Sequence, residues 1–160
     1  KVMRKAPKEV TTKFISDFRN MNIKLGMKQF LVPYFMSAHP GSTLKDALEL
    51  AEYIRDTGLR PEQVQDFTPT PGSISTCIYH TGIDPMTGEK VYVPKSFEER
   101  KMQRALLQYW MPENAELVRR ALEELGRTDL IGNTSHCLVQ QSRNYTKKVK
   151  NAMDNSRYTR

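Results

Sequence analysis

One short apolar segment limits the possible folds of this chain more than any other feature. Residues 29–36 have the sequence QFLVPYFM, which is nearly all apolar or aromatic and does not alternate with polar residues. Such a run ahead of a Gly- and Ser-containing loop is typical of a strand covered on both faces, as in parallel sheets. Pro33 cannot donate to a ladder, so we expect the strand to bend or lose pairing there.

A helix and a second strand are predicted directly after this segment. Residues 39–43 form the loop, and Thr43 with Asp46 predicts a capping box that opens the helix. The helix ends at Gly58, before a second short strand over residues 61–67. The predicted buried stripe of the helix comprises Leu44, Ala47, Leu48, Ala51 and Ile54. This order predicts a parallel βαβ unit with the loop at the carboxyl end of the first strand.

Further helices are predicted on both sides of this unit. Before it, apolar residues at three- and four-residue steps over 7–25 predict a helix with one buried stripe. That stripe comprises Val10, Phe14, Phe18, Met21 and Leu25. After the unit, residues 68–95 are rich in turn residues, which predicts a long ordered loop that could include a small hairpin. Two more helices begin at Ser96, in a capping box with Glu99, and at Pro112.

The net charge of +7 is unevenly distributed along the chain. Residues 140–160 contain six Lys and Arg against one Asp and therefore carry +5 of this total, so we expect a basic, disordered tail there. The tail could bind nucleic-acid phosphates, which leaves a non-catalytic nucleic-acid-binding module as the alternative function.

Neither membrane nor metal binding is predicted. No apolar run reaches the roughly 20 residues of a membrane span, and no signal-peptide pattern follows the basic start. Two cysteines fit a reducing compartment, and we expect a cytoplasmic protein. Cys77 and His80 with His136 and Cys137 would supply four zinc-type ligands, but adjacent His and Cys rarely bind one ion together.

Three longer segments match a known family in addition to these patterns. They are KQFLVPYFMSAHPGST over residues 28–43, QVQDFTPTPG over 63–72 and STCIYHTGIDP over 75–85. In these segments, and in shorter stretches up to residue 139, the chain resembles the YgiQ family of radical SAM proteins. The resemblance implies an α/β fold: residues 1–67 would be the C-terminal part of a radical SAM-type βα barrel, and residues 68–139 a mostly helical extension of unknown role.

The resemblance also implies a function for the longer protein. Such a protein would use a [4Fe–4S] cluster and SAM to make a 5′-deoxyadenosyl radical that acts on an unknown substrate. Family members hold the cluster with an upstream three-cysteine motif, whereas this chain has two cysteines, sixty residues apart. We therefore expect the chain to bind neither cofactor alone, to be inactive alone, and to need the N-terminal remainder of its own protein as partner.

Candidate site residues lie at the two predicted strand ends, where ligands of βα folds bind. The resemblance implies cofactor contacts for the first group, Ser37, His39, Gly41, Ser42, Phe67 and Thr68. Two further residues, Gln65 and Asp66, are candidates for hydrogen bonds to the substrate. The same residues could instead form a helix cap and a buried polar pair that satisfies loop backbone, and no residue is predicted to be catalytic or to bind a metal.

Overall fold

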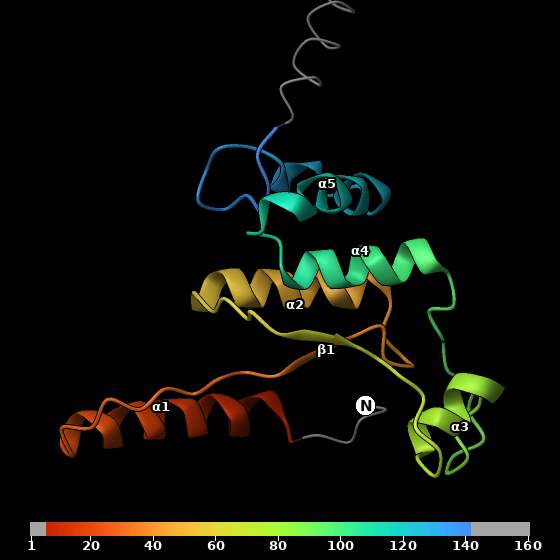
Figure 1. Ribbon diagram of the computed structural model, residues 1–160, viewed down its shortest axis with the longest axis horizontal. Coiled ribbons are helices and arrows are strands. Elements are labelled where there is room, and N and C mark those ends of the chain that lie inside the picture. The colour runs from red at the N-terminus through yellow and green to blue at the C-terminus, as the bar shows by residue number, and fades with distance from the viewer. Residues whose placement is uncertain (1–5, 142–160) are drawn as a thin grey trace, which may run out of the picture.

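The computed structural model describes residues 6–141 and has mixed helical and strand structure (Figure 1). Most of the predicted basic tail, residues 140–160, lies outside this range. The elements are α1 (Lys8–Lys24), β1 (Phe35–Ser37), α2 (Leu44–Thr57), β2 (Val64–Asp66), α3 (Ile74–Thr81), α4 (Phe97–Leu107) and α5 (Ala115–Glu124), with short 3₁₀ turns η1 (Pro112–Asn114) and η2 (Thr128–Leu130). Among the described helices, none is long and apolar enough to cross a membrane.

The predicted βαβ unit is present. β1 and β2 pair in parallel, with Phe35 opposite Val64 and Ser37 opposite Asp66. β1 begins two residues after Pro33, so the strand predicted over residues 29–36 is shorter than expected. This agrees with the loss of pairing expected at that proline.

Helix α2 forms as the sequence predicts. The Thr43 side chain accepts from the backbone N–H of Asp46, and the Asp46 carboxylate accepts from the N–H of Thr43, which completes the capping box. Gly58 ends the helix in a left-handed conformation, with φ of 68°. All five residues of the predicted stripe are buried.

The prediction of a loop over residues 68–95 is wrong in part, because this segment contains helix α3. The Ser73 hydroxyl caps the helix by accepting from the N–H of Thr76, and Gly82 ends it with φ of 69°. The helix has eight residues and buries one of them, Ile78, so no apolar stripe reveals it in the sequence. An antiparallel bridge between Ile83 and Lys90 corresponds to the possible hairpin.

Only one of the two hydrogen bonds of the capping box predicted at the start of α4 is present. The Ser96 hydroxyl accepts from the N–H of Glu99 at 3.5 Å. The Glu99 carboxylate binds Tyr92 and Gln103 instead of turning back to the helix start.

One core joins the βαβ unit to the later helices. In Figure 1, α2 and α4 run side by side over the strand pair, and α5 covers the far side of α4. The main cluster of buried residues takes members from all three helices and from the segment after α5: Leu44, Ala47, Leu48, Ala51, Met102, Ala105, Leu106, Val118, Ala121, Leu122, Leu130, Leu138 and Val139. The core therefore crosses the predicted boundary between residues 67 and 68. Two strands do not make a barrel, so the structure is α/β without a barrel among the described residues.

Helix α1 differs from its prediction in burial. The helix forms, but Val10, Phe14, Met21 and Leu25 of its apolar stripe are 56–60% exposed. The prediction of a buried stripe is wrong for these four residues, because nothing within residues 6–141 covers this face. The helix shares a groove of about 430 Å³ with the extended residues 29–33.

Candidate functional site

A polar cluster lies where β1 and β2 end. The hydroxyl of Ser37 donates to Oδ1 of Asp66 at 2.5 Å, and Nη1 of Arg104 lies 3.3 Å from Oδ2. The side chains of Asp66 and Arg104 are 36% and 49% exposed, so both can be reached from solvent. The carboxyl ends of parallel strands are the usual ligand-binding edge of α/β folds, and this edge presents a carboxylate beside a guanidinium.

The loop after β1 is held by a glutamine from α4. Ala38 has φ of 56°, an uncommon conformation for a residue with a side chain. Its N–H donates to Oε1 of Gln103 at 3.2 Å, and the hydroxyl of Ser42 donates to the same oxygen at 3.3 Å. Nε2 of Gln103 donates to the carbonyl of Ser42 and to Glu99, both at 3.0 Å. Gln103 is fully buried, so the loop is fixed from inside the molecule.

His39 is buried and connects the same loop to α3. Nδ1 lies 2.8 Å from the carbonyl of Pro40 and Nε2 lies 2.9 Å from the hydroxyl of Ser75. A carbonyl can only accept, so Nδ1 carries the hydrogen, and in the neutral ring Nε2 accepts from Ser75. The ring also meets Phe67 edge-on, with centroids 5.0 Å apart. Phe67 is itself buried and contacts Tyr79 on α3.

The structure brings some predicted site residues together and separates others. Ser37 and Asp66 meet, whereas Gln65 and Asp66 are neighbours on one strand and so face opposite sides of the sheet. Gln65 and Thr68 are exposed. The N–H of Gly41 donates to the carbonyl of Tyr92 at 2.7 Å. Ser37, His39 and Ser42 hydrogen-bond within the chain, and cofactor contacts of these residues stay a prediction.

Four residues that contact the strand-end loops were absent from the predicted site. They are Ser75, Tyr92, Gln103 and Arg104, all from residues 68–139. The sequence contains a signal for Gln103. This polar residue lies next to Met102 on a helix whose buried face is otherwise made of apolar residues such as Ala105 and Leu106. Buried polar side chains are almost always hydrogen-bonded, so a glutamine at this position indicates a specific partner.

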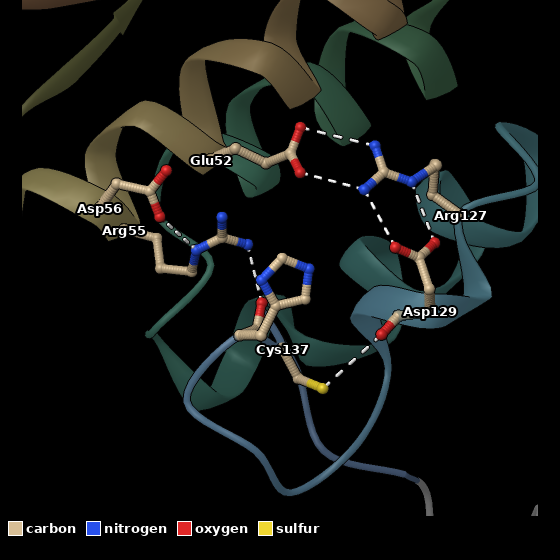
Figure 2. A network of polar contacts seen from close by, with 7 residues as sticks. Glu52, Arg55, Asp56, Arg127, Asp129 and Cys137 are labelled. Carbon is tan, nitrogen blue, oxygen red and sulfur yellow. Dashed lines mark hydrogen bonds and ion pairs between the residues drawn. The ribbon is translucent and has the colours of Figure 1, made fainter.

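A second polar network ties the segment after α5 to α2 (Figure 2). Nη2 of Arg127 lies 3.0 Å from Glu52 and 3.0 Å from Asp129, and its Nε lies 2.9 Å from Asp129. Hydrogen bonds to Asp129 and Glu52 raise the pKa of Arg127, and the bond from Arg127 lowers the pKa of Asp129. Arg55 of α2 donates to the carbonyl of His136 at 2.7 Å. The network joins two segments of the same chain and serves the fold.

The donor set does not fit an iron–sulfur cluster. Cys77 and Cys137 are both free thiols. In the part of the chain that the structure describes, no three His, Cys, Asp or Glu side chains are grouped to hold a metal ion. A [4Fe–4S] cluster takes three or four cysteine thiolates, and the chain has two.

The chain is similar to known proteins of two named groups. The family described as Domain of unknown function (DUF3362) matches residues 62–160. A UPF0313 protein of Methanocella arvoryzae is 58% identical over 135 residues, which cover 84% of this chain and 22% of that protein. UPF0313 proteins of Methanosarcina mazei and Clostridium botulinum (strain 657) are 55% and 54% identical, over 87% and 86% of this chain and 22% of each relative.

The chain thus spans about a fifth of the length of the curated relatives it matches. No solved structure matches.

Proposed function

Because this chain belongs to the family of the domain of unknown function DUF3362, and its UPF0313 relatives are the YgiQ-type radical SAM family, we propose that it forms one side of a radical SAM active site. The family resemblance of the sequence is confirmed by these matches. In the proposal, residues 1–67 complete a βα barrel whose other strands come from the longer polypeptide, and residues 68–139 are its extension.

We propose that the longer polypeptide binds the cofactors. Bound to the longer polypeptide and supplied with one electron by an external reductant, a [4Fe–4S] cluster and SAM would provide a 5′-deoxyadenosyl radical, with methionine as the other product, for reaction with an unknown substrate. The two cysteines of this chain cannot hold the cluster, so its ligands belong to another part of the protein. We therefore propose that this chain is inactive alone. We also propose that the longer protein is cytoplasmic.

One observation carries the proposal: the solvent-accessible pair of Asp66 and Arg104, held by the buried Ser37 hydroxyl, lies at the carboxyl ends of two parallel strands. These groups fit the polar parts of SAM or of a substrate. The Asp66 carboxylate can accept from ligand hydroxyl groups, and the Arg104 guanidinium can bind a ligand carboxylate. Thr68 is exposed two residues after Asp66 and adds a hydroxyl group, whereas Gln65 is exposed on the opposite side of the sheet and could meet a substrate only there.

The partner in this proposal is the remainder of the longer polypeptide. The exposed apolar residues of α1 are joined by Phe30 and Val32 in the extended segment before β1. We infer that these exposed apolar side chains, on a helix and an extended segment that share a groove, belong to an interface. β1 pairs with β2 along one edge, and its other edge has no strand beside it within residues 6–141. A further parallel strand can therefore add there and cover the apolar segment.

The nucleic-acid alternative is not favoured by these findings. It depends on the basic residues of 140–160, most of which lie outside the described structure. The family matches point to the radical SAM proteins instead.

The decisive experiment uses the full-length family protein that carries this sequence, with its cluster reconstituted. Under reducing conditions with SAM, we expect formation of 5′-deoxyadenosine and methionine. An Asp66→Asn variant should weaken SAM or substrate binding, because the amide cannot replace a charged acceptor. A Glu116→Gln variant in α5 is the matched control. Intact SAM after reduction of a fully loaded cluster would refute the proposal.

A further inference from the structure

The extension of unknown role has a buried polar side chain with three of its four hydrogen-bond partner atoms in the loop after β1. This side chain is Gln103 of α4, and its four partner atoms belong to Ala38, Ser42 and Glu99. We propose that the DUF3362 region positions this loop for ligand binding, with Gln103 as the positioning residue. The ligand part of this inference rests on the proposed function, whereas the positioning of the loop does not.

The hydrogen bonds of Gln103 leave no capacity unused. A glutamine amide has two N–H donors and an oxygen with two lone pairs. Both lone pairs accept, from the N–H of Ala38 and the hydroxyl of Ser42. Both donors are used, on the carbonyl of Ser42 and the carboxylate of Glu99. An apolar residue would fill the same space, so the amide specifies a conformation in addition to filling the core.

The loop conformation needs such support. Ala38 has a positive φ, which costs about 1 kcal/mol or more for a residue with a side chain. The cost is offset only when surrounding groups fix the conformation. The N–H of Ala38 is directed at Gln103 in this conformation, so the hydrogen bond and the unusual backbone depend on each other.

A chain of hydrogen bonds through Tyr92 and Glu99 also connects Gln103 to the same loop. The backbone carbonyl of Tyr92 accepts from the N–H of Gly41. The side-chain hydroxyl of Tyr92 donates to the carboxylate of Glu99. Glu99 in turn accepts from Gln103, which binds Ser42, the residue next to Gly41. Residues from the extension therefore contact consecutive positions of the loop through both backbone and side chains.

The test compares Gln103 of α4 with Gln108, the residue that directly follows α4. Gln108 is also buried, but its Nε2 donates to the carbonyl of Glu62, away from the loop. In the full-length protein, hydrogen exchange followed by mass spectrometry compares peptides covering residues 37–43 and 45–57. We expect Gln103→Leu to lower protection of the loop peptide by about tenfold and that of the α2 peptide by less than twofold. Gln108→Leu should leave the loop peptide unchanged.

A second variant separates hydrogen bonding from packing. Gln103→Glu has nearly the same shape, but its carboxylate cannot donate and is repelled by Glu99. The protonated carboxyl group can donate one hydrogen bond, and its carbonyl oxygen can accept from both Ala38 and Ser42, so loop protection should recover in part on acidification. Equal loss of protection in both peptides with Gln103→Leu, no loss in either, or no recovery with Gln103→Glu would overturn the positioning role.

SAM binding to the full-length protein decides the ligand part of the inference. Isothermal titration should show an affinity at least about tenfold weaker for Gln103→Leu than for Gln108→Leu. Equal affinities would overturn control of the ligand by the loop. If the unmodified protein fails to bind SAM, the proposed function and the ligand part fail together, while the exchange data still decide whether Gln103 positions the loop.

Discussion

The hydroxyl of Ser37 donates to the carboxylate of Asp66 at 2.5 Å, joining the last residues of two parallel strands. Ser37 is buried, so replacing it with alanine removes a hydrogen bond and should lower the free energy of unfolding by about 1 kcal/mol. Gln65→Ala, at an exposed neighbouring position, is the control and should change it by less than about 0.5 kcal/mol. Urea unfolding measures both, and equal losses would contradict this account.

Acid should weaken the contact between Arg127 and Asp129 in the segment after α5. The hydrogen bond from Arg127 lowers the pKa of Asp129 below its ordinary value of 3.8. A carboxyl group with a lowered pKa in the folded state adds stability above its unfolded pKa and loses it as the pH falls through the folded pKa. We therefore expect a loss of stability below about pH 4 that Arg127→Gln makes smaller.

Thermal unfolding at a series of pH values measures this acid effect. Lys13→Gln on α1 is the control, because its ion pair with Asp17 is highly exposed and lies outside the core. An unchanged acid dependence in the Arg127→Gln protein would exclude the Arg127–Asp129 contact as its source.

At alkaline pH, Tyr92 should lose its proton, and its contribution to the stability of the fold should be lost with it. Its hydrogen bond to Glu99, together with desolvation, raises the pKa of Tyr92 to about 12 from an ordinary value of 10.0. The folded state retains the proton longer than the unfolded state, so this contribution is complete below pH 10 and is lost as the pH rises toward 12. Near-ultraviolet absorbance of tyrosinate should show a late titration near pH 12 that decreases in Tyr92→Phe. A Tyr34→Phe control should keep it.

The sequence predicts local structure well where one chain segment contains all the determinants. Thr43, Asp46 and Gly58 define the ends of α2, and the helical period identifies its buried face. Helix α3 was missed because eight residues between turns carry no apolar period. The contacts of Gln103 could not be predicted, since its partners Ala38 and Ser42 lie more than sixty residues earlier in the chain.

Helix α1 shows a second limit of sequence patterns. Periodicity indicates that one face is apolar, but it does not say which segment covers that face. Phe14 and Met21 follow the predicted period and are nevertheless exposed. No segment among residues 6–141 buries these side chains, so a correct amphipathic pattern goes with an incorrect prediction of burial.

The exposed apolar residues before β1 predict that one substitution acts differently in this chain alone and in the full-length protein. Phe30 is 85% exposed, so Phe30→Ser should change the free energy of unfolding of this chain alone by less than about 0.5 kcal/mol. In the full-length protein the proposed partner segment buries Phe30, and the same change should cost about 3 kcal/mol. Leu106→Ala, in the core of α4, should cost about 2–5 kcal/mol in both settings. Chemical unfolding of the four variant proteins measures the difference, and a Phe30→Ser cost that is equally small in the full-length protein would show that its remaining part does not cover this surface.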